Sequence, residues 1–204
     1  MKLYYSPGAC SLSPHIVACE AGIALQLEKV DLKAKRTESG RDFVAINPKG
    51  YVPTLELDDG QILTEGPAIV QYLADRKPES GLAPAAGTMG RYRLQEWLTY
   101  IGTELHKTYS PLFSPDTSDE IKQSRKDYLR RRYALVENTL AKQPFLLGEQ
   151  FTAADAYLFT VTNWARLVHL DLADMPALHA FMQRVSERPG VRAALEAEGL
   201  LRKA

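Results

Sequence analysis

The chain carries a cysteine, Cys10, at a position where a thiol could be reactive. Residues 2–5 predict a short strand, residues 6–9 a turn, and residues 11–21 a helix. Cys10 therefore stands at the start of a helix, where unsatisfied backbone N–H groups and the helix dipole favour negative charge. Thiols at such positions can have pKa values lowered from ~8.5 to roughly 3.5–7.5. Free cysteines are also among the most buried residue types, so a small buried side chain remains the alternative.

Two further pairs of residues could hold a peptide-like ligand. Pro53 begins a predicted strand, where a trans bond is the default, but a cis bond would turn the N–H and C=O of Val52 outward for strand-like pairing. Thr64, Glu65 and Gly66 begin a predicted helix, whose N–H groups could bind a carboxylate while Glu65 accepts from an ammonium group. The α-amino-acid end of a ligand, with its ammonium and carboxylate groups, would match Glu65 and this helix N-terminus. The commoner arrangement is an acidic residue that only complements its own helix dipole.

A polar row follows in the second half of the chain. Thr99, Thr103 and His106 are spaced i, i+4 and i+7, which predicts one face of a long helix. There His106 could donate to a thiolate and favour its charged form. The alternative is a histidine at the rim of the apolar seam, satisfied by a neighbour or by water. Lys107 either adds positive charge to this place or faces solvent.

Composition and charge exclude several classes of protein. The 204 residues include 25 Lys and Arg against 25 Asp and Glu, so no net field recruits nucleic acid or an anionic membrane. No segment approaches the ~20 apolar residues of a membrane helix, and the N-terminus does not resemble a signal peptide. The two cysteines, Cys10 and Cys19, do not form a disulfide framework. We therefore expect a cytoplasmic protein without nucleic-acid or membrane partners. The histidine and cysteine spacings also predict no metal site.

The periodicity divides the chain into two parts. The first ~80 residues mix strand and helix signals in the order βαβαββα. Strands are expected at residues 2–5, 26–31, 52–57 and 61–63, and helices at 11–21, 39–46 and 65–76, with 33–38 as a charged loop. A linker follows over residues 77–87. The remainder is helical, with an apolar stripe formed by Leu94, Leu98, Ile101, Leu105 and Leu112, and further helices at 118–142, from Thr152, 175–187 and 190–198. Thr152 and Asp155 form a capping box, and we interpret Asp155 as structural.

Residues 2–13, 47–53 and 63–69, in that order, resemble the bacterial beta-class glutathione S-transferases. Residues 104–107 and 151–157 extend the resemblance into the helical half, so that it covers nearly the whole chain. The resemblance implies an α/β plus all-α protein. A thioredoxin-like, glutathione-binding domain over residues 1–80 would be joined to an all-helical domain over residues 87–204, which carries the co-substrate side. The family also implies a homodimer.

The resemblance implies roles for particular residues. The cysteine that matches Cys10 is the catalytic or glutathione-linked thiol of the family, with Ser11 and His106 close by. Pro53 matches the cis-proline, and Val52 would pair with the cysteinyl backbone of glutathione. The implied glutathione contacts are Cys10, Lys35, Tyr51, Val52, Pro53, Glu65, Gly66, Thr99, Thr103, His106 and Lys107. Among these, Lys35 would approach the glycyl carboxylate, and Glu65 with Gly66 would hold the γ-glutamyl end.

Two features depart from the family pattern or stay open within it. Thr99 stands where the family usually has the asparagine that reaches the partner subunit, and a hydroxyl is shorter and offers only one donor. The second substrate is expected against the helical domain near Phe113 and Trp164, although we interpret both aromatic side chains as core.

The leading hypothesis is an enzyme that conjugates glutathione to a small, electrophilic, largely apolar molecule. Glutathione is the co-substrate, no metal is required, and Cys10, Ser11 and His106 form the catalytic set; Tyr5 and Ser11 are competing anchors for the sulfur. An alternative is a glutathione-dependent thiol-disulfide reductase or reductive dehalogenase that acts through a Cys10 mixed disulfide. A third possibility is a non-catalytic regulatory binding protein on the same fold.

Overall fold

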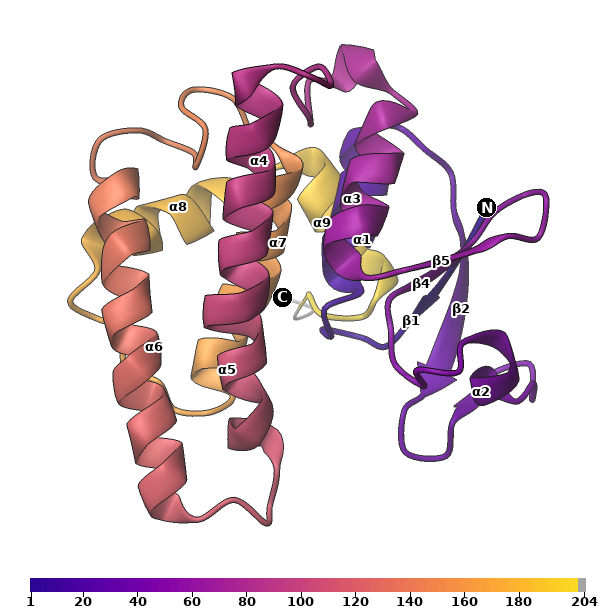
Figure 1. Ribbon diagram of the computed structural model, residues 1–204, viewed down its shortest axis with the longest axis horizontal. Coiled ribbons are helices and arrows are strands. Elements are labelled where there is room, and N and C mark those ends of the chain that lie inside the picture. Colours follow the sequence, from indigo (N-terminus) through magenta and orange to yellow (C-terminus); the bar gives the residue numbers. More distant parts are fainter. Residues whose placement is uncertain (202–204) are drawn as a thin grey trace. The chain divides into compact units, whose positions relative to one another are not determined.

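The computed structural model describes residues 1–201, whose packing defines two units (Figure 1). Unit 1 consists of Met1–Ala83 together with the segment that begins at Ser186. Unit 2 is the continuous segment Pro84–Val185. The expected second domain runs from residue 87 to the end of the chain, whereas the packing places the last helix in unit 1.

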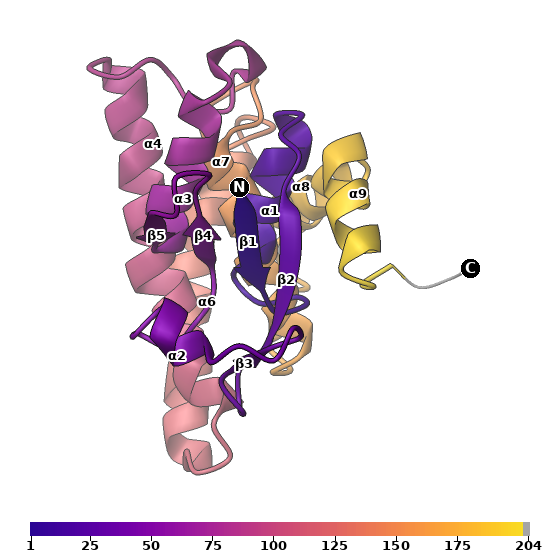
Figure 2. The same ribbon diagram turned by 90° about the vertical axis from the view of Figure 1, so that its right-hand side faces the viewer.

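Unit 1 is built on a five-stranded sheet with the strand order β3-β2-β1-β4-β5 (Figure 2). Its strands are β1 (Lys2–Tyr5), β2 (Gln26–Asp31), β3 (Arg36–Thr37), β4 (Thr54–Glu56) and β5 (Ile62–Thr64). β1 and β2 are parallel, with Leu3 opposite Leu27, and they are joined by the helix α1 (Leu12–Glu20). The other pairs are antiparallel. The sheet therefore has the βαβ start that the sequence predicts, with one additional short strand.

Helices cover both faces of this sheet. Besides α1, unit 1 contains α2 (Phe43–Ile46), α3 (Gly66–Asp75), a 3-10 turn (Pro78–Ser80) and α9 (Pro189–Ala197). α1, α3 and α9 lie on one side of the sheet (Figure 1). On the other side Phe43 of α2 packs on Tyr4, with ring centroids 5.7 Å apart, in a cluster with Val30 and Val52. Successive strand residues thus serve opposite faces of the sheet.

The last helix of the chain packs tightly against the first. Arg188 Nη2 lies 2.5 Å from Glu20 Oε2. A Cβ placed on Gly190 would lie 2.7 Å from Glu20 Oε1 and 2.8 Å from Glu20 N, so only glycine permits this approach. Close backbone packing and an ion pair therefore join α9 to the end of α1.

Unit 2 is helical throughout its regular elements. They are α4 (Met89–Tyr100), a π-helix (Ile101–His106), α5 (Lys107–Tyr109), a 3-10 turn (Ser110–Phe113), α6 (Asp119–Leu140), α7 (Ala153–Thr162), a 3-10 turn (Asn163–Arg166) and α8 (Pro176–Ser186). The predicted apolar stripe forms its core, because Leu94, Ile101 and Leu105 are fully buried. Ser118 caps α6 by accepting from Ile121 N at 3.4 Å.

Three predicted elements differ from the structure. The expected helix 39–46 begins only at Phe43, because Asp42 caps it through Val44 N at 3.0 Å. The expected loop 33–38 includes β3, which pairs with the end of β2. The continuous helix expected after residue 88 changes from α to π geometry over Ile101–His106.

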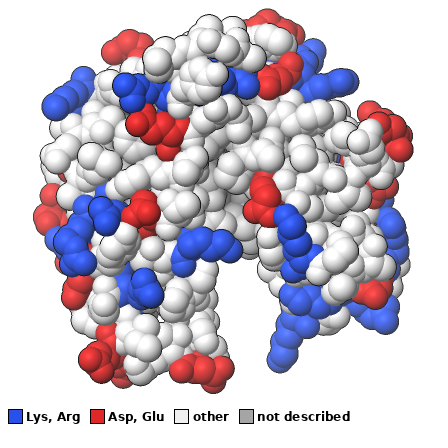
Figure 3. Space-filling model, viewed as in Figure 1, with Lys and Arg blue, Asp and Glu red and all other residues white. Residues whose placement is uncertain are grey.

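On the face that Figure 3 shows, acidic and basic side chains both occur over most of the surface, with basic side chains more numerous at its lower right. The composition of the whole chain is balanced, with 25 Lys and Arg against 25 Asp and Glu. Within residues 1–201, no helix has the length and apolar character needed to cross a membrane.

Candidate functional site

The turn that carries Cys10 is held by Ser11. Ser11 Oγ accepts from Ser6 N at 3.1 Å and donates to Ser6 O at 3.2 Å, and its side chain is fully buried. Ser11 is the N-cap residue of α1, and Cys10 directly precedes it. The Cys10 carbonyl accepts from Ser13 N at 3.2 Å and from Ser13 Oγ at 2.9 Å. The thiol is thus fixed at the N-terminal end of α1, as the sequence predicts, while the Ser11 hydroxyl serves the turn.

The Cys10 thiol contacts the predicted Val52–Pro53 pair. Cys10 Sγ donates to Val52 O at 3.1 Å, and the Val52–Pro53 peptide bond is cis. The trans bond taken as the default for this sequence is therefore wrong, and the cis form that the family resemblance implies is present. Asn47, which is almost fully buried, donates through Nδ2 to Tyr51 O and to Thr54 Oγ1, each at 2.9 Å. These bonds fix the backbone on both sides of the Val52–Pro53 bond.

Asn47 was not among the predicted site residues. The sequence shows it only as the polar residue that ends a short helix before Pro48. That position is the one available signal, since an asparagine at a helix end can satisfy backbone groups of the following loop.

The predicted Glu65–Gly66 pair lies against the Val52–Pro53 pair. A Cβ added to Gly66 would stand 3.8 Å from Pro53 Cγ and 4.0 Å from Ser13 Oγ. The N-terminus of α3 therefore meets both the cis-proline and the first turn of α1. Glu65 is the N-cap residue of α3, which begins at Gly66. It adopts φ +72°, a left-handed conformation that costs energy for a residue other than glycine and is typical of functional sites.

The Glu65 carboxylate already holds a cation and a hydroxyl. Lys49 Nζ lies 2.5 Å from Glu65 Oε1, and Tyr51 OH donates to the same oxygen at 2.8 Å. Hydrogen bonding to Glu65 raises the pKa of Lys49 and that of Tyr51. Both side chains are exposed at this place. The carboxylate thus binds an ammonium group in this structure, which is the chemistry that its sequence context predicts.

Lys35 completes the group in unit 1. Its Nζ donates to Gly50 O at 2.7 Å, next to Tyr51, and its backbone adopts φ +56°. The structure therefore brings together seven of the predicted residues on one unit, through contacts that link each to the next: Cys10, Val52, Pro53, Gly66, Glu65, Tyr51 and, through Gly50, Lys35.

The remaining predicted residues lie on unit 2, where His106 ends the π-helix. His106 Nδ1 lies 2.5 Å from Tyr157 OH, and the imidazole packs edge-on to Trp164 with centroids 4.9 Å apart. Thr99, Thr103 and Lys107 are exposed, and Thr103 Oγ1 donates back to Thr99 O at 3.1 Å. A π-helix turns less per residue than an α-helix. Thr99 and Thr103 are therefore exposed while His106 is partly buried, although α-helical spacing predicts one common face for the three side chains.

Aromatic side chains surround the imidazole within unit 2. Tyr109 and Phe113 each pack edge-on to Trp164, with centroids 5.7 and 5.8 Å apart. Trp164 is buried, as expected for core, whereas Phe113 is 50% exposed. The core interpretation is therefore right for Trp164 and wrong for Phe113.

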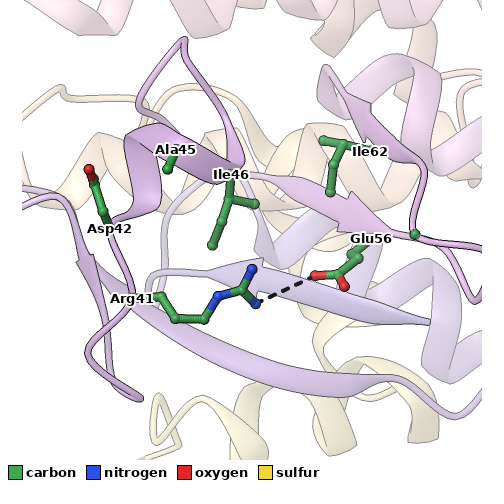
Figure 4. A pocket seen from close by; sticks show the side chains of 7 residues that line it. Arg41, Asp42, Ala45, Ile46, Glu56 and Ile62 are labelled. Atoms are coloured by element: carbon green, nitrogen blue, oxygen red, sulfur yellow. Dashed lines mark ion pairs between the residues drawn. The ribbon is translucent and has the colours of Figure 1, made fainter.

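A cavity in unit 1 contains none of the predicted residues. It has a volume of about 450 Å³, and its lining is Arg41, Asp42, Ala45, Ile46, Glu56, Gly60 and Ile62 (Figure 4). Arg41 points across it toward Glu56, with Nη1 3.9 Å from Oε2. Tyr4 OH donates to the same oxygen of Glu56 at 2.5 Å. Burial, together with this bond to Glu56, raises the pKa of Tyr4 to about 12, so the phenol stays protonated.

Asp155 has the structural role that the sequence predicts. It forms a capping box with Thr152, whose N and Oγ1 both donate to Asp155 Oδ2 at 2.8 Å. Its Oδ1 accepts from Leu146 N at 2.8 Å. In the described part of the chain, no group of three or more His, Cys, Asp or Glu residues is placed to hold a metal ion.

Comparison with known proteins agrees with this arrangement. Residues 8–76 match the family model of the glutathione S-transferase N-terminal domain, and residues 100–189 match that of the C-terminal domain. The glutathione S-transferase GstA of Escherichia coli O157:H7 is 51% identical over 98% of this chain and all of its own length.

Solved structures give the same result. The bacterial transferase BphK, in a ternary complex, has a TM-score of 0.97 at 55% identity, covering 98% of this chain and 100% of its own. A sphingomonad glutathione S-transferase complexed with glutathione has a TM-score of 0.95 at 47% identity, with the same coverage. The beta-class enzyme of Sphingomonas chungbukensis has a TM-score of 0.95 at 45% identity, again with 98% and 100% coverage. The chain is therefore a member of the glutathione S-transferase family, of the bacterial beta-class type.

Proposed function

We propose that this transferase binds glutathione on unit 1 and joins its sulfur to a small, electrophilic, largely apolar molecule. The observation that carries the proposal is the contact of Cys10 Sγ with Val52 O, beside the start of α3 at Gly66. It places a thiol, a backbone edge and a helix N-terminus with a carboxylate within one surface. Glutathione presents a thiol, a peptide backbone and an amino-acid end in that same order. A sphingomonad relative is known in complex with glutathione.

Each end of glutathione has a chemically matched partner. The Val52 carbonyl has a second lone pair besides the one that accepts from Cys10, so it can also accept from the cysteinyl N–H. The ammonium of the γ-glutamyl end would take the place of Lys49 Nζ at Glu65, and its carboxylate would lie at the N–H groups of α3 after Gly66. Lys35 Nζ would leave Gly50 O for the glycyl carboxylate.

The chemistry depends on the glutathione thiolate. Its negative charge is favoured by the N-terminal end of α1, where Ser11 holds the turn rigid. For His106, Thr99, Thr103 and Lys107, which lie on unit 2, we propose the glutathione-contact roles that the family resemblance implies. The half-exposed Phe113, packed on Trp164, would offer an apolar platform for the electrophile. In the reaction the sulfur forms a bond to the electrophilic carbon, and the leaving group departs with the electron pair of the broken bond.

The family and the composition support a proposal for the location and the assembly of the protein. We propose a cytoplasmic homodimer without a metal cofactor, in which Thr99 replaces the contact that an asparagine usually makes with the partner subunit.

A second candidate function is favoured by Cys10 itself. A thiol at the sulfur position could attack a mixed disulfide of glutathione, forming a Cys10–glutathione disulfide and releasing the other thiolate, which takes up a proton. A second glutathione would then reduce Cys10 and leave as glutathione disulfide. Ser13 stands where a resolving cysteine would be needed, so release falls to free glutathione.

One comparison of variants separates the two functions. Conjugation and disulfide reduction are measured for the wild type, Cys10→Ala and the matched control Cys19→Ala. Conjugation that survives in Cys10→Ala while reduction disappears assigns Cys10 to the redox reaction alone. Loss of both assigns it to both. Failure of the folded wild type to bind immobilised glutathione would show that the surface on unit 1 is not a glutathione site.

A further inference from the structure

The contact between His106 and Tyr157 has a consequence for the reaction. We propose that Tyr157 is a positioning residue for His106, whose phenolic O–H donates to Nδ1 and so holds the proton of the neutral imidazole on Nε2. The inference rests on the proposed function, in which His106 donates a hydrogen bond to the glutathione thiolate. An imidazole that presents Nε2–H can donate to a thiolate, whereas the other tautomer presents a lone pair and repels it.

The geometry of the pair is well defined. His106 Nδ1 and Tyr157 OH are 2.5 Å apart, and the two rings meet edge-on at a centroid separation of 5.8 Å. Tyr157 is almost fully buried, with 2% of its surface exposed. In a buried place a polar pair that loses one partner carries a desolvation cost, so this bond holds the ring orientation strongly.

The direction of the bond follows from the chemistry of the two groups. A neutral imidazole has one N–H and one acceptor nitrogen. A phenol is a strong donor but a poor acceptor, because its oxygen lone pair is delocalised into the ring. The imidazole acceptor nitrogen is in turn a better acceptor than a phenolic oxygen. The stable arrangement therefore has Tyr157 as donor and Nδ1 as acceptor, with the proton on Nε2.

Three features of unit 2 hold the phenol of Tyr157 and the imidazole of His106 in place. Tyr157 lies in the first turns of α7, whose start is held by the Asp155 capping box. A Cβ on Gly102 would lie 3.7 Å from Tyr157 OH, so the π-helix passes close to this hydroxyl. Trp164 packs against the imidazole at 4.9 Å. Functional groups carried on supported elements of this kind keep their geometry better than groups on loops.

The π-helix determines the direction in which the His106 side chain points. Such segments are rare and are frequently found at functional sites. Here the segment ends at His106, and Leu105 within it remains fully buried. The wider turn thus keeps the apolar seam closed while His106 reaches Tyr157 on α7.

The tautomer can be observed directly by nitrogen NMR of protein labelled with 15N-histidine. The chain has four histidines, and a His106→Gln variant identifies the signals of His106. At pH values where this ring is neutral, we expect the wild type to show the Nε2–H tautomer. In Tyr157→Phe, which keeps the buried ring, we expect a mixture of both tautomers. Tyr133→Phe removes another buried hydroxyl of unit 2, bonded to Tyr109, and should leave the His106 signals unchanged.

Kinetics provide a second readout. We expect Tyr157→Phe to lower kcat for conjugation roughly 10-fold, as is typical when the partner that orients an active histidine is removed, with little change in the KM for glutathione. An Nδ1–H tautomer in the wild type, or an unchanged tautomer in folded Tyr157→Phe, overturns the inference. The wild-type result requires only that His106→Gln, the variant used for assignment, also folds. If His106→Gln leaves kcat unaltered while the tautomer is as expected, the fault lies with the proposed role of His106 and not with the positioning by Tyr157.

Discussion

His15 on the first helix and Glu198 after the last helix form a buried pair, with Nδ1 2.9 Å from Oε1. The other oxygen of Glu198 accepts from Gly8 N at 2.9 Å, inside the turn that carries Cys10. Burial by itself lowers the pKa of His15, but hydrogen bonds to Cys19 and Glu198 outweigh it and raise the pKa to about 9. The end of the chain thus stabilises the loop that presents the thiol.

This pair predicts a pH dependence of stability. Because the folded pKa of His15, about 9, lies above its unfolded value of 6.5, its contribution is complete below pH 6.5 and is lost as the pH rises through 9. The loss should amount to roughly 3 kcal/mol of unfolding free energy. Urea unfolding at pH 6 and pH 9.5 measures it. In Glu198→Gln the difference between these two pH values should be smaller, and an equal difference in both proteins would contradict the assignment to this pair.

Gly190→Ala should destabilise unit 1. The added Cβ would approach both the side chain and the backbone N of Glu20 within 2.8 Å, so α9 must shift away from α1. We expect a loss of about 2 kcal/mol, within the range for overpacked sites. Gly102→Ala is a suitable control, because its Cβ would meet Tyr157 OH at an ordinary 3.7 Å. Equal thermal stability of the Gly190→Ala variant and the wild type would show that the approach of the two helices is not tight.

Asp155→Ala should destabilise unit 2. The substitution leaves Leu146 N, Thr152 N and Thr152 Oγ1 without the carboxylate that they share in a fully buried site. At about 1 kcal/mol for each bond, the expected loss is roughly 3 kcal/mol. Asp155→Asn keeps two acceptor lone pairs and should lose less. Chemical denaturation of both variants gives the order, and the reverse order would argue against the capping box.

Glu65→Gln should weaken the binding of glutathione without slowing the chemical step. Removal of the negative charge takes away the charge-assisted bond to the ammonium group, which is worth roughly 2 kcal/mol. The KM for glutathione should therefore rise at least about 10-fold, while kcat changes little. Glu56→Gln, in the cavity of unit 1 that contains none of the predicted residues, is the matched control and should leave the KM unchanged. A fall in kcat at constant KM would place Glu65 at the reacting sulfur instead.

Local patterns predicted much of the fold. Periodicity placed β1 and β2 at their observed bounds and identified the buried row that includes Leu94 and Leu105. The expected bounds placed the start of α6 at Ser118, and capping chemistry placed that of α7 at Thr152. These features depend on residues within one or two turns of each other, so the sequence is sufficient to show them.

The features that local sequence patterns did not show depend on residues far apart in the chain. The cis bond at Pro53 and the bonds of Asn47 belong to packing between separate segments. The π-helix forms where Gly102 meets α7, although the spacing of its residues is compatible with an α-helix. The placement of α9 in unit 1 depends on Glu20 and His15, more than 160 residues earlier in the chain.

For the candidate site, residue types and order indicated the chemistry before the geometry was known. Cys10, Val52 and Gly66 come together as expected. Ser11 shows the limit of that reasoning, because a hydroxyl next to a reactive thiol has the right type for catalysis, yet its hydrogen bonds serve the backbone of Ser6.

The placement of α9 also bears on how the protein is made. Unit 2 is one continuous segment and has all its residues before α9 is translated. The partners of His15 and Glu20, namely Glu198 and Arg188, are synthesised more than 160 residues after them. The first segment of unit 1, although synthesised before unit 2, can therefore complete its packing only after α9 has left the ribosome. Until then a nascent chain presents the turn that bears Cys10 without the support of Glu198.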